Sequence, residues 1–347
     1  MFSANRGNKF QLATLIYFIL GNLLFGLLIG LSGLEVGIIT SVLVSQFLMV
    51  GLTVVTYIFI TKASLKNDLF IKPLAWIDVL ICIGLAWTIM PILSFINVLS
   101  QFVVKNQIED ALVDLLNIPL ILTLFLTAVC PAILEELLSR SIILRNYQTK
   151  TVLATCLLSG MFFGFIHLNI NQFLYAFVMG IIMCFIVMIT DSVLSSMVIH
   201  FTINATGTIT LYLVNAMMKI FDNSGVAMDQ MMSSADPTTA QLLLSLVMMF
   251  FLILFFTPLT YLLLKLLMRR HNKQFKGSWR MVTSEFMRRH VEVADHSFSK
   301  DIETAKEADT YKLMPSEEKF KSWPLMLSAI LFLVFALMVE FTSRSIG

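Results

Sequence analysis

Long uninterrupted apolar runs constrain this chain more than any other feature of its sequence. The first extends from Leu12 to Leu31, and similar runs recur along the 347 residues. Charged residues make up only 13% of the chain and hydrophobic residues 58%, whereas about a quarter of a soluble domain is charged. Polar groups cannot cover the surface of such a chain, so lipid must solvate it. The runs lack the alternation of a membrane barrel, and the sequence predicts an all-α polytopic membrane protein.

The apolar runs divide into about nine predicted transmembrane helices, since a helix needs about 20 apolar residues to cross the bilayer. The predicted spans lie near residues 11–33, 36–61, 75–98, 117–146, 152–169, 171–190, 192–218, 240–268 and 324–342. The first run is longer than the h-region of a cleavable signal peptide, which has about 7–15 residues. We therefore expect it to remain as a transmembrane helix.

The distribution of basic residues predicts the orientation. Lysine and arginine precede the first span and follow the second, fourth and eighth, whereas acidic residues predominate after the third and seventh. Cytoplasmic loops carry the excess of lysine and arginine. We expect a multi-pass protein of the plasma membrane with a cytoplasmic N-terminus.

The chain divides into five predicted regions. These are N-terminal helices with an interfacial segment, a four-helix catalytic core, an outer loop with the eighth span, a charged cytoplasmic loop and the last span, at residues 1–116, 117–218, 219–268, 269–323 and 324–347. The charged loop opens with a strongly basic stretch, which is typical of a cytoplasmic retention loop. A regulatory partner bound by loop 269–323 is the alternative interpretation.

The fourth predicted span contains three charged residues in an apolar setting: Glu135, Glu136 and Arg140. A charge at the centre of a span costs about 2.5–3.5 kcal/mol on insertion scales, so each is a candidate functional residue. Glu136 and Arg140 are four residues apart and can pair directly. Glu135 points about 100° away from Glu136 and has no such partner within its own helix. We interpret Glu136 and Arg140 as structural and Glu135 as functional.

Two of the five histidines, His167 and His200, are predicted inside spans. Asn204 follows His200 by four residues, which places imidazole and amide on one helix face. From a turn near residue 149, Glu135 lies about 21 Å and His167 about 27 Å along antiparallel helices, a mismatch of about one turn that tilt can absorb. The sequence predicts that these groups form one site.

These residue types permit two chemistries. A buried glutamate with a histidine can activate water, while His200 and Asn204 can donate hydrogen bonds to a developing oxyanion. The trio of Glu135, His167 and His200 is alternatively a set of zinc ligands, although the sequence has no HExxH helix. Both interpretations stay open on residue types alone.

Other small and polar residues in the spans have structural interpretations. Gly160 and Gly164 form a GxxxG pair that predicts close packing of the fifth span against a neighbour. The spacing around Ser159 does not support a serine nucleophile paired with a base. The four cysteines all fall in apolar runs and are expected to be free buried thiols.

Three short motifs in one order resemble those of the CPBP family, which comprises CAAX proteases and bacteriocin-processing or bacteriocin-immunity proteins and is also called Abi. The motifs are Glu135-Glu136-xxx-Arg140, Phe163-xxx-His167 and His200-xxx-Asn204. Each is weak alone, but together they span about 70 residues of predicted membrane helix. The resemblance covers roughly residues 115–215 and implies a CPBP/Abi-like core helix bundle.

The resemblance also implies residue roles. Glu135 and His167 would activate water, and His200 and Asn204 would bind the oxyanion. The supporting residues would be Glu136, Arg140 and Phe163. The implied reaction is glutamate-dependent and uses no metal or other cofactor.

We therefore expect an intramembrane endopeptidase that cleaves a membrane-associated peptide or protein, with no role for nucleic acid. The first alternative is a non-catalytic membrane scaffold or bacteriocin-immunity protein that retains the fold. The second is a transporter that uses Glu135 as a proton relay, but the chain lacks the internal repeat expected of such folds.

Overall fold

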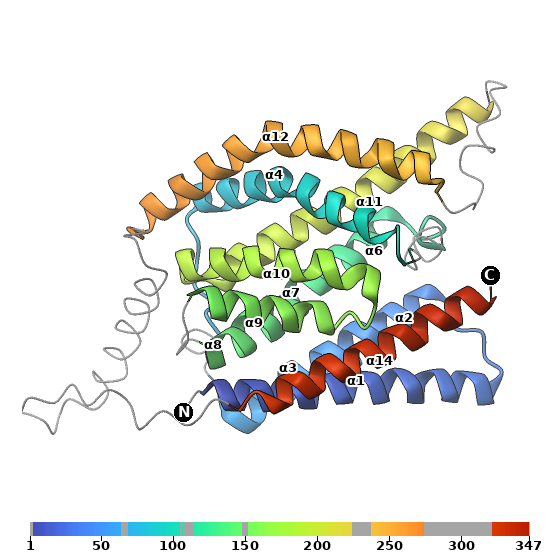
Figure 1. The fold of residues 1–347 in the computed structure, drawn as a ribbon, viewed down its shortest axis with the longest axis horizontal. Coiled ribbons are helices and arrows are strands. Elements are labelled where there is room, and N and C mark those ends of the chain that lie inside the picture. The colour runs from blue at the N-terminus through green and yellow to red at the C-terminus, as the bar shows by residue number, and fades with distance from the viewer. Residues whose placement is uncertain are drawn as a thin grey trace, which may run out of the picture.

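The computed structural model describes residues 3–63, 69–104, 106, 114–147, 152–223, 237–273 and 321–346. Within these ranges every regular element is a helix (Figure 1). This confirms the predicted all-α class. The basic part of loop 269–323 beyond Lys273, where a regulatory partner is the alternative prediction, lies outside the described residues.

Eight of the described helices are long and apolar enough to cross a membrane, at Ala4–Ser32, Ile38–Thr61, Trp76–Ser100, Leu120–Tyr147, Ile170–Thr190, Val193–Ile220, Thr239–Arg270 and Trp323–Thr342. The fifth predicted span, near residues 152–169, corresponds to a shorter apolar helix, α9 (Val152–Phe165). The prediction extended this span to residue 169, but Leu168 has a left-handed φ of 54°. The backbone turns there, so the apolar residues after Phe165 form a connection and not another helical turn.

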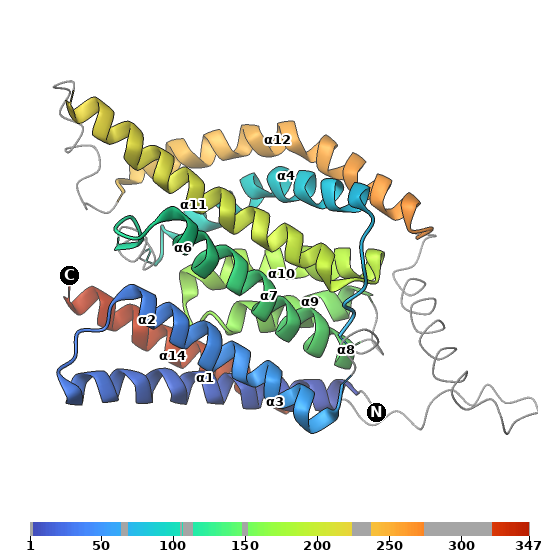
Figure 2. The ribbon, with the colours of Figure 1, turned by 180° about the vertical axis from the view of Figure 1, so that it is seen from behind.

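The helices form three groups across the bundle (Figures 1 and 2). On one side, α12 (Thr239–Arg270) packs on α4 (Trp76–Ser100). The middle contains α9, α10 (Ile170–Thr190) and α11 (Val193–Asn223), together with the fourth span.

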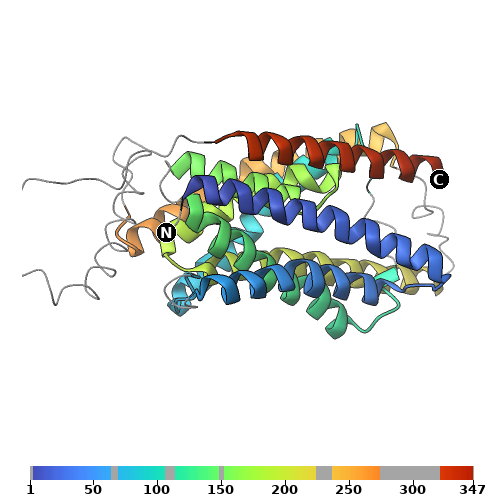
Figure 3. The ribbon, with the colours of Figure 1, turned by 90° about the horizontal axis from the view of Figure 1, so that it is seen from below.

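The opposite side of the bundle contains the first, second and last spans. They are α1 (Ala4–Ser32), the second span and α14 (Trp323–Ile346). Figure 3 shows α1 between α14 and the second span. The second span consists of α2 (Ile38–Leu43), a π-helical segment η1 (Val44–Gly51) and α3 (Leu52–Thr61). The two chain ends lie at opposite ends of the bundle (Figure 1).

The fourth span is built from five consecutive segments. They are α6 (Leu120–Leu124), η2 (Phe125–Val129), α7 (Cys130–Glu136), η3 (Leu137–Ile143) and α8 (Leu144–Tyr147). Both η segments are π-helical, and they flank α7, which carries both glutamates. Pro131 lies in α7, where its missing N–H and its ring disturb the preceding turn. The π-helical turn η2 immediately before it accommodates that disturbance.

Glycines set the spacing between α9 and α10. A Cβ atom built on Gly160 would lie 2.7 Å from the carbonyl oxygen of Phe177, and one on Gly180 would lie 2.7 Å from the Cα atom of Gly160. A Cβ atom on Gly164 would lie 2.6 Å from the Phe173 ring. These contacts confirm the close packing predicted from the GxxxG pair.

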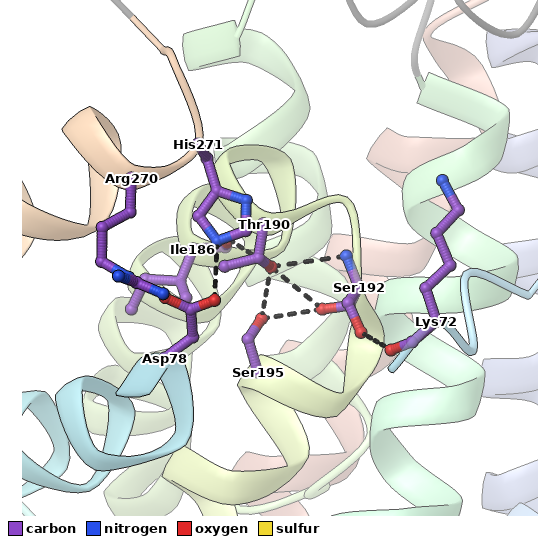
Figure 4. A network of polar contacts seen from close by, with 8 residues as sticks. All are labelled: Lys72, Asp78, Ile186, Thr190, Ser192, Ser195, Arg270 and His271. Atoms are coloured by element: carbon purple, nitrogen blue, oxygen red, sulfur yellow. Dashed lines mark hydrogen bonds and ion pairs between the residues drawn. The ribbon is translucent and has the colours of Figure 1, made fainter. Parts of the chain in front are cut away.

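A polar network ties together helix ends at one end of the bundle (Figure 4). Buried Asp78, in the first turn of α4, accepts a hydrogen bond of 2.6 Å from Arg270 Nε and lies 3.3 Å from His271 Nε2. Between α10 and α11, the Ser192 hydroxyl donates to the carbonyl of Lys72. This end is therefore fixed by side chains and not by apolar packing alone. The four cysteines, in the interior of the bundle, are free and buried, as predicted.

Candidate active site

Glu136 is the centre of a fully buried ion pair. Its Oε1 atom lies 2.9 Å from Arg140 Nη1 and also 2.9 Å from His200 Nδ1, and both Glu136 and Arg140 have no exposed surface. The guanidinium carbon of Arg140 lies 4.0 Å from the centre of the Phe163 ring. This cation–π contact stabilises the Arg140 guanidinium, whose Nε and Nη2 atoms have no hydrogen-bond partner among the described residues. The pair that the sequence spacing allows therefore forms, and it includes His200.

The Glu136 contact determines the proton position on His200. An ionised carboxylate only accepts hydrogen bonds, so Nδ1 of His200 carries the hydrogen. Nε2 makes no hydrogen bond to any described residue. It therefore donates to another group only when the ring is the imidazolium.

His167 lies in the connection between α9 and α10, and not inside a span as the sequence predicted. Its Nδ1 atom is 2.7 Å from the carbonyl oxygen of Phe163. A carbonyl accepts hydrogen bonds and cannot donate them, so Nδ1 carries the hydrogen and neutral His167 presents a lone pair on Nε2. That nitrogen makes no hydrogen bond within the described part of the chain. His167 is thus held in the tautomer that a base requires.

Glu135 has a partner that the sequence analysis missed. The residue is 8% exposed, and its Oε1 atom accepts a hydrogen bond of 2.9 Å from Gln46 Nε2 on η1. Gln46 is the only amide in Ile38–Thr61, and an isolated amide in an apolar span was the signal that could have identified it. Glu135 is therefore unpaired within its own helix but not within the molecule.

The groups predicted to form one site interact in the structure. The charge of Glu135 acts on His167, as do the charges of Arg140 and His200. The Phe163 ring lies between the two imidazoles, with centroid distances of 5.0 Å to His167 and 5.7 Å to His200, both edge to face. The sequence predicted a difference of about one helical turn between the positions of Glu135 and His167 along their helices, and this difference does not separate the two residues.

Asn204 joins the site through the backbone of the fourth span. Its Nδ2 atom donates to the carbonyl oxygen of Thr127 at 2.9 Å. Pro131, four residues after Thr127, has no N–H to offer that carbonyl, so the side chain of Asn204 supplies the donor. The two amide hydrogens of Asn204 leave one N–H for another acceptor. His200 and Asn204 occupy one helix but have separate fixed partners.

The alternative zinc set does not form a ligand group here. Among the described residues, no three His, Cys, Asp or Glu side chains are arranged to hold a metal ion. His200 directs Nδ1 to Glu136, and Glu135 is bonded to Gln46. Ser159, a position considered for a nucleophile, is buried and donates to the carbonyl oxygen of Ser139 at 3.4 Å. Glu135 and His167 can carry out acid–base chemistry in this arrangement.

Comparison with known proteins gives one family match. Residues 117–206 match the family model described as Type II CAAX prenyl endopeptidase Rce1-like. No curated protein and no solved structure matches the chain significantly. The matched segment includes all three motifs and every residue described at the site except Gln46. Residues 117–206, about a quarter of the chain, are therefore similar to Rce1-like CAAX prenyl endopeptidases.

Proposed function

We propose that this protein is an intramembrane glutamic endopeptidase that cleaves a membrane-associated peptide or protein with water activated by Glu135 and His167. One observation carries the proposal. Glu135 is a nearly buried carboxylate beside a histidine whose tautomer leaves a lone pair on Nε2. Removal of a carboxylate from water is expensive unless the group is paired, and no basic side chain donates a hydrogen bond to Glu135 among the described residues.

In this mechanism Glu135, assisted by His167, accepts a proton from water, and the resulting hydroxide attacks the carbonyl carbon of the scissile peptide bond. The free N–H of Asn204 and Nε2–H of protonated His200 donate to the oxyanion of the tetrahedral intermediate. The proton held by Glu135 or His167 then passes to the leaving nitrogen as the C–N bond breaks. Glu136 and Arg140 hold His200 in place.

The substrate class and the membrane orientation are also part of the proposal. A site within the bundle requires a substrate that reaches it from the membrane, such as a bacterial peptide undergoing maturation. The start of α1, α8 and the end of α12 lie at one end of the bundle (Figure 1). The excess of basic residues near these helix ends supports an orientation in which this end of the bundle faces the cytoplasm, in a protein of the plasma membrane.

The first test identifies the substrate and the base together. Peptides that accumulate in membranes of cells carrying Glu135→Gln, compared with wild type, are identified by mass spectrometry. An internally quenched fluorescent peptide of that sequence then serves as the probe for purified protein in detergent. We expect Glu135→Gln and His167→Ala to lower cleavage by at least about 100-fold, since the loss of acid–base catalysis costs about 10²–10⁴-fold.

Ser159→Ala is the matched control, because it removes a buried polar group of the same bundle that has no role in the mechanism. It should cleave the probe at the wild-type rate. All variants should insert and accumulate equally. Normal processing by both Glu135→Gln and His167→Ala would exclude the protease function and favour the scaffold or immunity function. In that case deletion of residues 281–318 should abolish the biological effect.

Metal dependence is tested with the same probe. We propose a reaction without metal, so incubation with a strong chelator followed by its removal should leave the rate unchanged. Loss of activity that zinc restores would instead support the ligand set of Glu135, His167 and His200.

A further inference from the structure

Gln46 lies outside the segment that matches the family model, yet it contacts the proposed base. It belongs to η1 (Val44–Gly51) in the second span, 89 positions before Glu135. π-helical turns occur often at functional sites, and here such a turn faces the segment that carries Glu135. The family match therefore does not cover all groups at the site.

The contact depends on a close approach between η1 and α7. A Cβ atom on Gly51 would lie 3.3 Å from the carbonyl oxygen of Gln46 and 3.7 Å from Leu134 Cδ1. Leu134 immediately precedes Glu135, so η1 and α7 lie against each other beside the Gln46–Glu135 contact. The 2.9 Å bond from Gln46 Nε2 to Glu135 Oε1 then links the second and fourth spans.

The surroundings of Glu135 show what this bond contributes. Arg140, His167 and Tyr175 interact electrostatically with Glu135, but none of them donates a hydrogen bond to it among the described residues. Within those residues, Gln46 is the donor that fixes one carboxylate oxygen. A hydrogen bond to an ionised group is about twice as strong as a neutral one.

Packing alone does not explain an amide at position 46. The Oε1 atom of Gln46 is buried and has no hydrogen-bond partner among the described residues. An unsatisfied buried acceptor costs about 1–3 kcal/mol, and an apolar side chain of similar length would fill the same space without that cost. The hydrogen bond that Gln46 Nε2 donates to Glu135 must offset the cost of the unsatisfied Oε1 atom.

We propose that Gln46 is a positioning residue for Glu135, whose Oε1 atom it holds so that the remaining lone pairs of the carboxylate face the attacking water. This inference rests on the proposed function of Glu135. Gln46 touches neither substrate nor water in this role and acts only through the carboxylate.

Gln46→Met tests the inference because methionine has a similar length and no hydrogen-bond donor. The quenched peptide described above is the probe. We expect kcat to fall about 10–100-fold, since misplacement of a catalytic group by 1 Å can cost about 100-fold, with KM within about twofold of wild type. The pH profile of kcat/KM should differ from that of wild type, because the carboxylate loses its donor while Arg140, His167 and Tyr175 are unchanged. Gln46→Asn keeps a donor and should recover part of the rate.

Gln11→Met is the matched control. Gln11 is a fully buried amide in α1 whose Oε1 atom accepts from the Tyr147 hydroxyl at 3.3 Å. Its replacement should lower the unfolding temperature but leave kcat and the pH profile unchanged. An equal loss of kcat in Gln11→Met and Gln46→Met would show that both act through stability and would overturn the inference.

The Glu135→Gln result separates the two proposals. If Glu135→Gln is inactive while Gln46→Met has wild-type kcat and pH profile, the positioning role fails and the protease function stands. If Glu135→Gln remains active, the proposed function fails first and the role of Gln46 fails with it.

Discussion

At the residue scale, Glu136 and Arg140 show how the chain keeps two charges inside a membrane protein. One carboxylate oxygen, Oε1, accepts from both Arg140 and His200, and the guanidinium also rests on the Phe163 ring. Each partner compensates for part of the desolvation of the other. When one partner is removed, the remaining buried charge has no compensation, and this loss exceeds the net contribution of the intact pair.

We predict that Arg140→Met lowers the free energy of unfolding by about 3–5 kcal/mol, the typical loss when a buried pair is broken. The measurement is thermal unfolding of purified protein in detergent. The double variant Glu136→Gln/Arg140→Met removes both charges and should recover part of the lost stability. If Arg140→Met is as stable as wild type, the buried ion pair does not contribute as described.

The proton positions on the two histidines are also set at this scale. His167 donates to a backbone carbonyl and His200 to the carboxylate of Glu136, and both rings carry the hydrogen on Nδ1. The two imidazoles therefore have different partners although the sequence presents both as single histidines in apolar runs.

At the element scale, the approach of α9 to α10 positions His167. The chain leaves α9 at Phe165, passes through the turn at His167 and enters α10 at Ile170. The Asn169 side chain accepts from the backbone N–H of Gln172 and begins α10. Any shift of α9 relative to α10 therefore moves His167, which assists the proposed base Glu135.

We predict that Gly160→Ala destabilises the protein by about 1–3 kcal/mol, the usual penalty for overpacking, and lowers cleavage of the quenched peptide. The added Cβ atom would lie 2.7 Å from the Phe177 carbonyl oxygen, and backbone cannot give way as a flexible side chain can. The measurements are the unfolding temperature and the cleavage rate.

Gly207→Ala is the control for this prediction. Gly207 lies in α11 with nothing within 4 Å of an added Cβ atom. The substitution should be neutral or stabilise the helix by up to about 1 kcal/mol. If Gly160→Ala behaves like Gly207→Ala, close α9–α10 packing does not position the site.

At the scale of the whole molecule, side-chain contacts hold the outer helices to the core at one end. Arg270, at the end of α12, reaches Asp78 at the start of α4 (Figure 4). The Tyr147 hydroxyl in α8 donates to Asn8 Oδ1 in α1 at 2.8 Å. The Asn8 side chain in turn donates to the carbonyl of Lys321, just before α14. These bonds connect spans that are distant in sequence.

We predict that Asp78→Ala lowers the free energy of unfolding by about 1–3 kcal/mol, because it removes hydrogen bonds to charged groups. Arg270 is partly exposed, which places the effect below that of the fully buried Arg140 pair. The measurement is again thermal unfolding in detergent, with the cleavage rate below the transition expected to equal that of wild type. An unchanged unfolding temperature would show that Asp78 does not hold α12.

The sequence by itself determined the membrane class, the order of the helices and the motif residues. An apolar run of membrane-spanning length folds as a helix, because lipid offers no hydrogen bonds and the helix satisfies the backbone N–H and C=O groups within the segment. Ionisable groups in such runs are candidate functional residues, because a charged side chain in lipid has a high free-energy cost. The pairing of Glu136 with Arg140 also follows from local helix geometry, four residues apart.

Only the tertiary structure decided which groups meet across helices. Gln46 donates a hydrogen bond to Glu135, which lies 89 positions later in the sequence. Asn204 donates to the carbonyl oxygen of Thr127, to which Pro131 has no N–H to donate. The end of α9 before His167 was also beyond sequence reasoning, since apolar residues continue through the turn. Local spacing fixes contacts within one helix, whereas contacts between helices depend on packing depth and rotation, which periodicity does not encode.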